Sequence, residues 1–232
     1  YVLNGDEFRA KANDMKFGLN TPEVKWYPLA VDITRYAGEW VAVVVADDIY
    51  TAEDAAELVE VDYEPMEPII DPEEAYSERD RLVHPGHGSN VLYDGHFCWG
   101  PVDEDFAKAD EVLPVKVRWG RSSTVPIETF GVVARWDEAV DILDIWASIQ
   151  MPNYVELLAA TLQIPLNSVR LHQNVDVGGS YGVKRGIKHS VIVGYLSRKL
   201  RAPVRFVEDR LVNMASGDAH GPDRIFDTQV AF

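Results

Sequence analysis

The residues best suited to chemistry lie in one glycine-rich segment, VDVGGSYGVKRG, at positions 175–186. Glycines let a backbone approach a ligand closely and adopt positive φ angles. Lys184 and Arg185 add cations, and the first turn of the predicted helix that follows presents free N–H groups, so the segment could hold a pyrophosphate. Its spacing matches neither G-x-G-x-x-G nor G-x-x-x-x-G-K-[ST]. The pattern alone therefore favours a tight turn with positive φ, and an anion-binding turn is the alternative.

Five other polar residues are candidate site residues. Gln150 closes an apolar run, and such an amide is by itself more often bonded to nearby backbone. Glu128 lies between apolar residues. Because a buried carboxylate needs partners, we expect its carboxylate to be hydrogen-bonded or ion-paired within the fold rather than to act as an acid or base. His84 and His87 are interpreted as an exposed loop pair, since no cysteine or carboxylate cluster joins them at metal-ligand spacing. His220 is predicted to lie in a turn.

Composition excludes several classes of protein. The 232 residues include 38 acidic and 22 basic side chains, for a formal charge of -16, which argues against binding to nucleic acid or to an anionic membrane surface. No run of 18 apolar residues exists, so no membrane span is predicted. The single cysteine, Cys98, excludes an internal disulfide and a cysteine-ligated iron–sulfur cluster within this sequence. This usage fits a cytoplasmic protein.

The order of predicted elements indicates an α+β fold without a regular βαβ array. In the first third, residues 39–48 have the pattern of a strand buried on both faces. A helix follows with Thr51 as its N-cap, and residues 59–70 alternate like a second strand. Residues 71–100 are polar and turn-rich and are interpreted as an extended linker. Both ends of the sequence are typical of a piece of a longer chain.

The last two thirds hold further strands and helices. Tyr154, Leu157, Leu158 and Leu162 form one apolar stripe of a predicted helix. The strand that begins at 169 runs directly into the glycine-rich segment. The predicted helices are 103–113, 153–164 and 188–200, and the predicted strands are 114–120, 130–137, 139–150, 169–179, 203–209 and 224–232.

Taken in order, these segments resemble the large, molybdenum-binding subunit of the molybdenum hydroxylases, the family of xanthine dehydrogenase, aldehyde oxidoreductase and aerobic carbon monoxide dehydrogenase. The quoted motifs are YAGEWVAVVVADDIYTAEDAAELVEVDYEPMEPIIDPEEA, similar to the α/β-hammerhead; WASIQMP, similar to S-T-Q-x-P; VGGSYGVK, similar to G-G-G-F-G-x-K; and PVRFVEDRLVNM, similar to P-V-K-W-x-E-D-R-x-E-x-x. The resemblance implies an α/β-hammerhead domain followed by part of a molybdopterin-binding domain. It divides the chain into a hammerhead at 1–75, a linker at 76–118 and the first part of the molybdopterin-binding domain at 119–232.

The resemblance also implies a cofactor and a site. The cofactor would be molybdenum–molybdopterin, as its cytosine dinucleotide, with the metal held through the pterin rather than by protein ligands. The reaction would hydroxylate or oxidise a small carbonyl, heterocyclic or carbon monoxide-like substrate with water-derived oxygen. Electrons would pass to iron–sulfur clusters and FAD on partner subunits or domains, in a dimer of heterotrimers. The cofactor-binding residues carried over by position are Gln150, Gly178, Gly179, Ser180, Tyr181 and Gly182.

This sequence departs from the family pattern at three positions. Ser180 replaces a glycine, Tyr181 replaces a phenylalanine, and Arg185 stands where purine-oxidising members have glutamate, which disfavours a xanthine-like substrate. The family's catalytic glutamate, and the copper-binding cysteine loop of carbon monoxide dehydrogenases, are expected beyond residue 232. One alternative is a non-catalytic binding or assembly module that has lost the metal, with Ser180 and Tyr181 as traces of that loss. A generic phosphate-binding domain is the other.

Overall fold

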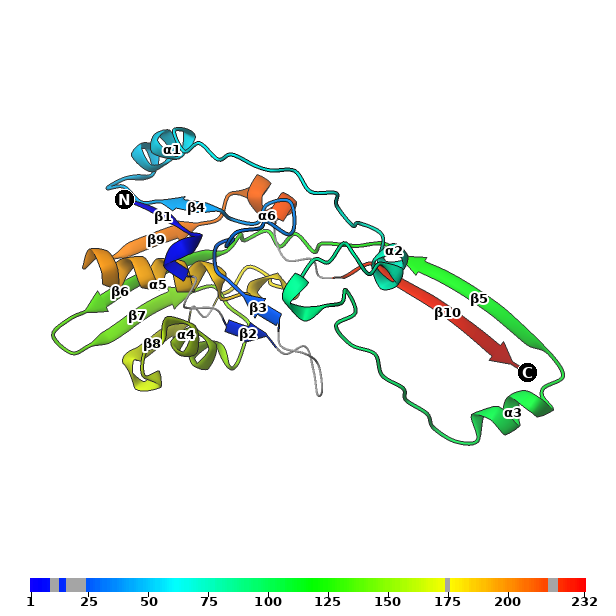
Figure 1. Cartoon of the computed structure of the whole chain (residues 1–232). Helices are drawn as coiled ribbons and strands as arrows, with labels where there is room; N and C mark the ends of the chain where they lie inside the picture. The colour runs from blue at the N-terminus through cyan, green and yellow to red at the C-terminus, as the bar shows by residue number, and fades with distance from the viewer. Residues whose placement is uncertain (9–12, 16–23, 174–175, 217–220) are drawn as a thin grey trace. The chain divides into compact units, whose positions relative to one another are not determined.

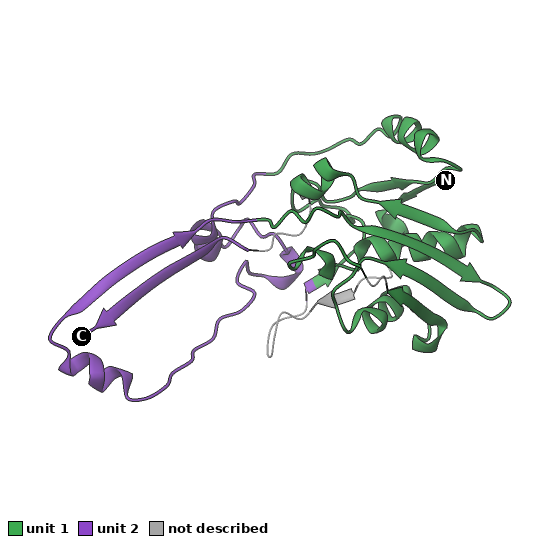
Figure 2. Cartoon of the chain, turned by 180° about the vertical axis from the view of Figure 1, so that it is seen from behind, with its two compact units in different colours: residues 1–15, 25–66, 123–218 green, residues 16–24, 67–122, 219–232 purple. Residues whose placement is uncertain are grey.

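The computed structural model describes residues 1–8, 13–15, 24–173, 176–216 and 221–232. The chain forms two compact units, shown in green and purple in Figure 2. Unit 1 is made of residues 1–15, 25–66 and 123–218, and unit 2 of residues 16–24, 67–122 and 219–232. The turn predicted at His220 lies outside the described residues. Helices and strands are mixed along the chain, which confirms the α+β prediction.

Unit 1 is built on a four-stranded sheet in the order β8-β7-β6-β9 (Figure 1). β7 runs antiparallel to β6 and parallel to β8, and β6 is also antiparallel to β9. The alternating apolar residues of β6 and β7 supply its buried face, because successive side chains of a strand point to opposite sides. The strands are β6 (Gly131–Asp137), β7 (Ile142–Ala147), β8 (Val169–Gln173) and β9 (Val204–Val207).

Two helices pack on this sheet and close the core of unit 1. α5 (Lys188–Leu200) contacts β6, β7 and β9, while α4 (Tyr154–Leu162) contacts α5 and β8. The predicted stripe of α4 is confirmed at three positions, since Tyr154, Leu158 and Leu162 are buried, and Leu157 is half-buried. The remaining helical pieces of this region are the 3-10 turns η3 (Leu166–Ser168) and η4 (Val183–Arg185) and the helix α6 (Arg210–Ser216).

The N-terminal part of unit 1 differs from its prediction. The expected strand at 39–48 is limited to β4 (Ala42–Val44), whose residues are half-buried, so burial on both faces was wrong. β4 pairs with β1 (Val2–Asn4) in a two-stranded sheet, which leaves its other edge unpaired within the described residues. A second small sheet joins β2 (Asn13–Met15) and β3 (Val24–Trp26), and η1 covers Gly5–Phe8.

The helix predicted near residue 51 is α1 (Ile49–Glu57), but its N-cap is Asp48 rather than Thr51. The Asp48 carboxylate accepts hydrogen bonds from the Thr51 backbone N–H (2.9 Å) and from its hydroxyl (2.8 Å). A carboxylate accepts more strongly than a hydroxyl and favours the positive end of the helix, so the cap lies three residues earlier.

Unit 2 is an antiparallel ribbon with short helices. Its strands are β5 (Val112–Trp119) and β10 (Arg224–Ala231), paired from Val112↔Ala231 to Trp119↔Arg224. The other elements are α2 (Pro72–Ser77), η2 (Pro85–His87) and α3 (Val102–Lys108). The prediction of a second strand at 59–70 was wrong, because these residues pair with no strand among those that the structure describes. Three prolines lie within or beside the run and remove backbone donors. No helix among the described residues is long and apolar enough to span a membrane.

Candidate functional site

Residues 176–182 of the glycine-rich segment form a tight loop that leads into η4. Gly179 and Gly182 have φ angles of +93° and +106°, and Tyr181 adopts +51°, which is uncommon for a bulky residue. The predicted tight turn with positive φ is therefore confirmed. The expected link to the helix N-terminus is not direct, because η4 separates the loop from α5, which begins at Lys188.

Gln150 follows β7 in the chain and holds this loop. Its Oε1 atom accepts hydrogen bonds from the Gly182 N–H (2.7 Å) and the Ser180 hydroxyl. Its own backbone N–H donates to the Lys184 carbonyl (3.3 Å). Because β7 ends at Ala147, Gln150 lies beyond the strand rather than closing it. The backbone-bonded amide that was expected is present, and its partner is the glycine-rich loop.

Glu128 is the second side chain that holds the loop. Its carboxylate accepts hydrogen bonds from Lys184 Nζ (2.8 Å), the Ser148 hydroxyl and the Gly178 N–H. Burial alone would raise the pKa of Glu128, but these three donors outweigh burial and lower the pKa to about 2. The carboxylate is therefore ionised and bonded to all three donors, as expected for a structural role rather than acid–base chemistry.

The two cations of the segment have different environments. Lys184 is 1% exposed and its ammonium is paired with Glu128, which is contrary to the alternative in which it donates to a phosphate. Burial requires the charge to be paired, and Glu128 is the acid within reach. Arg185 is exposed and forms no ion pair with the described residues. It is the cation of the segment that can meet a ligand.

Three hydrogen-bond donors at the loop are open. Within the described residues, the backbone N–H groups of Ser180 and Tyr181 and the Nε2 group of Gln150 have no hydrogen-bond partner. Because Gln150 Oε1 is held by Gly182 N–H, the amide orientation is defined and Nε2 is its free donor. Such donors suit an anionic or carbonyl-rich heterocycle, and the predicted residues Gln150 and 178–182 converge on one place.

The described part of the chain contains no group of side chains that could bind a metal ion directly. No group of three or more His, Cys, Asp or Glu residues there is arranged to hold a metal ion. His87 Nε2 is instead 3.1 Å from the Val91 carbonyl oxygen.

The sequence did not indicate that Ser148 belongs to the site or that Lys184 pairs with Glu128. Both side chains bond to Glu128, from which they are separated by 20 and 56 positions. A carboxylate between apolar residues signalled that partners were needed, but no spacing in the sequence could identify them. Only the adjacency of β7 and the loop brings these groups together.

Gly179 is a position where the loop tolerates no side chain. A Cβ atom there would lie 2.9 Å from Tyr181 Cε2 and 3.3 Å from Pro126 Cβ, at a φ of +93°. We expect Gly179→Ala to lower the free energy of unfolding by about 2 kcal/mol, measured by urea denaturation. Gly131→Ala is the matched control, since a Cβ atom at Gly131 meets no atom within 4 Å. Equal stability of the two variants would contradict the strained turn.

A buried carboxylate elsewhere in unit 1 is accounted for structurally. Asp144, on β7, is paired with Arg135 (3.0 Å), Arg170 (3.4 Å) and His172 (2.7 Å). Burial opposes ionisation, but hydrogen bonds from His172 and Arg135 outweigh it and lower the pKa of Asp144. All of these partners come from the sheet itself, so the cluster ties its strands together.

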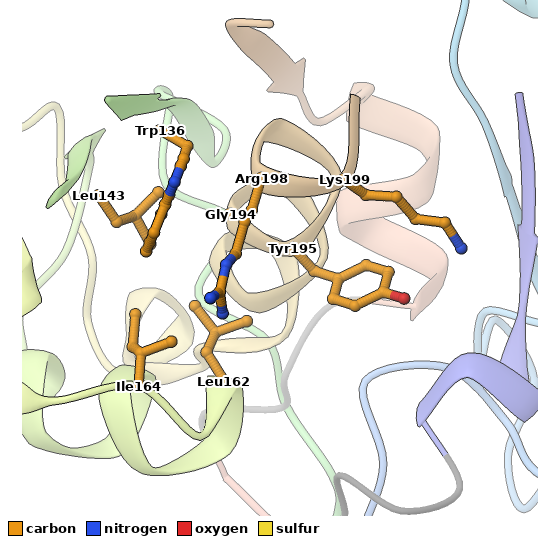
Figure 3. Close-up of a pocket in the computed structure, with 8 residues that line it drawn as sticks. All are labelled: Trp136, Leu143, Leu162, Ile164, Gly194, Tyr195, Arg198 and Lys199. Carbon is orange, nitrogen blue, oxygen red and sulfur yellow. The ribbon is translucent and has the colours of Figure 1, made fainter. Parts of the chain in front are cut away.

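Unit 1 also has a hollow of about 280 Å³ that involves none of the predicted site residues (Figure 3). Its polar groups are engaged: the Arg198 guanidinium lies 4.5 Å from the Trp136 ring centre, and both Lys199 and Tyr195 bond to Glu7. The residues around it are Trp136, Leu143, Leu162, Ile164, Gly194, Tyr195, Arg198 and Lys199. None of the residues that line this hollow belongs to the glycine-rich loop.

Comparison with known families assigns both halves of the chain. Residues 83–232 match the molybdopterin cofactor-binding domain, and residues 2–67 match the a/b hammerhead domain of aldehyde oxidase and xanthine dehydrogenase. A hammerhead domain followed by a molybdopterin-binding domain is the order expected from the sequence. The chain belongs to the molybdenum hydroxylase family, whose members are molybdopterin-dependent oxidoreductases.

Named relatives agree with this assignment. The 6-hydroxypseudooxynicotine dehydrogenase complex subunit gamma of Paenarthrobacter nicotinovorans is 37% identical over 204 residues, covering 88% of this chain and 25% of that protein. The carbon monoxide dehydrogenase large chain of Afipia carboxidovorans is 30% identical over 204 residues, covering 81% and 25%. The crystal structure of quinoline 2-oxidoreductase from Pseudomonas putida 86 matches with a TM-score of 0.89 and 28% identity, over 100% of this chain and 30% of that one. The chain thus spans about a quarter of the length of these curated relatives.

Proposed function

We propose that this chain supplies part of the cofactor-binding site of a molybdenum hydroxylase large subunit. The observation that carries the proposal is the convergence of Gln150 with the 178–182 loop, which leaves the Gln150 amide and two backbone N–H groups open. In this proposal residues 1–75 are the hammerhead, 76–118 the linker and 119–232 the first part of the molybdopterin-binding domain. Gln150, Gly178, Gly179, Ser180, Tyr181 and Gly182 bind the cofactor.

The donors at the loop fit the chemistry of a molybdopterin. Its phosphate and dithiolene groups are anionic, and its ring system accepts hydrogen bonds, which suits Ser180 N–H, Tyr181 N–H and the Gln150 amide. Glu128 and Lys184 neutralise each other, so they hold the loop without adding net charge to the site. When bound, this cofactor would supply a two-electron oxidation with an oxygen atom derived from water.

The chain's own residues would orient the cofactor rather than transfer protons. Glu128, with a pKa near 2 and three donors, is unable to act as a base at neutral pH. Arg185, exposed beside the loop, would add a positive charge for the anionic part of the cofactor. The base that acts on substrate would come from the part of the large subunit beyond residue 232.

The cofactor form and partners are inferred from the family. We infer a cytosine dinucleotide form of molybdopterin, and electron transfer to iron–sulfur and FAD groups on partner subunits, in a dimer of heterotrimers in the cytoplasm. Among the substrate classes considered, a nitrogen heterocycle is favoured, because relatives include a nicotine 6-hydroxylase large subunit and a quinoline 2-oxidoreductase. Arg185, in place of the glutamate of purine-oxidising members, disfavours a purine.

The second candidate is a binding or assembly module that has lost the metal. Its support was the pair of substitutions Ser180 and Tyr181, read as decay of the loop. The Ser180 hydroxyl, however, donates to Gln150 Oε1 and accepts from the Lys184 N–H at 3.3 Å. The substitution therefore adds contacts that order the loop, which favours a retained cofactor site.

Metal and pterin analysis separates these candidates. The complete enzyme, produced in a host that makes molybdopterin, is expected to contain about one molybdenum and one pterin per large subunit. A protein produced in a molybdopterin-deficient host serves as the control. Absence of both molybdenum and pterin after full cofactor supply would reject the enzyme proposal, and nucleotide binding that persists without molybdenum would favour a generic phosphate-binding domain.

A further inference from the structure

The E-D-R segment, Glu208–Arg210, lies outside the site described above but holds the residues around Glu128. The Glu208 carboxylate is 6% exposed and accepts a hydrogen bond from the Phe130 N–H (3.2 Å), and the Glu208 N–H donates to the Phe130 carbonyl (2.8 Å). Glu208 also accepts from Asn213 Nδ2 at 2.8 Å. The backbone after Glu128 is thus fixed from β9 and α6.

Arg210 fixes the backbone before Glu128. Its Nη2 donates to the carbonyls of Pro126 (2.7 Å) and Ile127, while its Nη1 donates to Asn213 Oδ1 (2.7 Å). Arg210 lies at the start of α6, and the Asp209 carboxylate accepts from the Leu211 N–H (2.7 Å) near that start. A planar guanidinium presents its donors in a rigid fork that can hold two neighbouring carbonyls and an amide at once, whereas lysine carries its three donors on a single nitrogen at the end of a flexible stem.

The segment that Arg210 holds contains a strained residue. Val125 has a φ of +39°, a conformation that costs a β-branched side chain free energy and persists only when neighbouring contacts hold it. The residue that follows is Pro126, whose carbonyl is one of the two bonded by Arg210. Without the guanidinium, we expect this turn to relax and residues 126–128 to shift.

A shift of Glu128 would be transmitted to the loop. The Glu128 backbone N–H donates to the Gly178 carbonyl (3.3 Å), and its carboxylate accepts from the Gly178 N–H and from Lys184. A Cβ atom on Gly178 would lie 2.6 Å from Glu128 Cβ, so the two residues are in close contact. The loop therefore depends on where Glu128 lies.

We propose that Arg210 is a positioning residue for the glycine-rich loop. It fixes the carbonyls before Glu128, and Glu128 in turn fixes Gly178 and Lys184, so the E-D-R segment shapes the site without touching it. The effect on the loop stands on contacts within unit 1. Its consequence for cofactor retention rests on the proposed function.

The test compares Arg210→Met and Arg210→Lys in the complete enzyme by amide hydrogen exchange. We expect Arg210→Met to speed exchange in peptides from 176–186 by about tenfold, and Arg210→Lys to give an intermediate effect. Arg201→Met is the matched control, since Arg201 pairs with the exposed Glu138 (2.8 Å), and it should leave these peptides unchanged. Bound pterin, measured after gel filtration, should fall in the order wild type, Arg210→Lys, Arg210→Met.

A double-variant cycle tests the route through Glu128. If Arg210 acts through Glu128, the combined variant Arg210→Met/Glu128→Gln should change loop exchange by less than the product of the two single effects. Independent effects, or faster exchange confined to 210–216, would overturn the proposal. Should Arg210→Met not fold, Arg210→Lys decides alone: loop exchange at the wild-type rate would overturn the proposal. Exchange measured on cofactor-free enzyme distinguishes the two proposals. A wild type that never binds pterin would reject the proposed function, whereas the exchange rate of the loop would still report on the role of Arg210.

Discussion

Glu128→Ala is expected to lower the free energy of unfolding by about 3 kcal/mol. The substitution leaves the Lys184 ammonium, which is 1% exposed, without its carboxylate, and an unpaired buried charge is among the most destabilising changes in a protein. It also removes the acceptor of the Ser148 hydroxyl and of the Gly178 N–H. Chemical denaturation of the purified protein at pH 7 measures the loss.

Two controls identify the cause of this loss. Adding Lys184→Met to Glu128→Ala removes the unpaired charge and should restore at least half of the stability. Glu7→Ala breaks a comparable pair with Lys199 in which both side chains are 33% exposed, so its cost should stay below about 1 kcal/mol. If Glu7→Ala and Glu128→Ala were equally destabilising, burial of Lys184 would not be the reason.

The loss of stability caused by Glu128→Ala is expected to depend on pH. The pKa of Glu128 is lowered from 4.5 to about 2 in the folded protein, so its stabilisation is present in full above the unfolded pKa and is lost as pH falls through the folded pKa. The difference between wild type and Glu128→Ala should therefore be constant from pH 7 to about pH 5 and shrink below that. A difference that grew with acidification would contradict this sign.

Gln150→Ala is expected to lower turnover of the complete enzyme by about 10²-fold while the protein still folds. The amide contributes one donor that faces the proposed cofactor, and loss of one well-placed donor has an effect of this size. Its bonds to Gly182 and Ser180 are at an exposed loop, so the free energy of unfolding should fall by no more than about 1 kcal/mol. Steady-state kinetics and denaturation, both on cofactor-loaded enzyme, give the two values.

A conservative variant separates the two roles of this side chain. Gln150→Glu keeps an oxygen to accept from Gly182 and Ser180 but removes the amide donor, so turnover should also fall although the loop remains held. Gln229→Ala, on the exposed ribbon strand β10, is the matched control and should leave turnover unchanged. Wild-type turnover in Gln150→Ala would reject a role for this residue at the cofactor.

Local patterns predicted α5, β6 and β9 well because each of these elements has a strong signal of its own. The helix α6 was not predicted, and the strand predicted at 169–179 ends at Gln173. Residues 188–200 were predicted as a helix and form α5 with those bounds. Strands β6 and β9 lie within the predicted ranges 130–137 and 203–209. Their apolar residues repeat at the spacing of one buried face, and buried faces are what the folded state selects.

The N-terminal third was predicted less well because its signals depend on tertiary partners. A run such as 39–48 reads as a central strand, but β4 pairs with β1 alone and is only half-buried. Residues 59–70 alternate in polarity, and still no strand lies beside them in the described residues. Strand pairing is a long-range property, so alternation without a partner strand does not make a sheet.

The order of its motifs, through the family resemblance, led the sequence to predict that Gln150 and residues 178–182 belong to one site, and its glycines predicted the tight turn. It also established that Glu128 needed partners. The tertiary structure decided what those partners are: Lys184 turns inward to Glu128, Ser180 and Gly182 bond to Gln150, and Arg185 alone of the two cations faces outward. The reason is burial, because whether a charge is paired or exposed to solvent depends on which segments pack around it. These partners lie 20 to 56 residues apart in the sequence, and local sequence patterns do not show which distant segments will pack together.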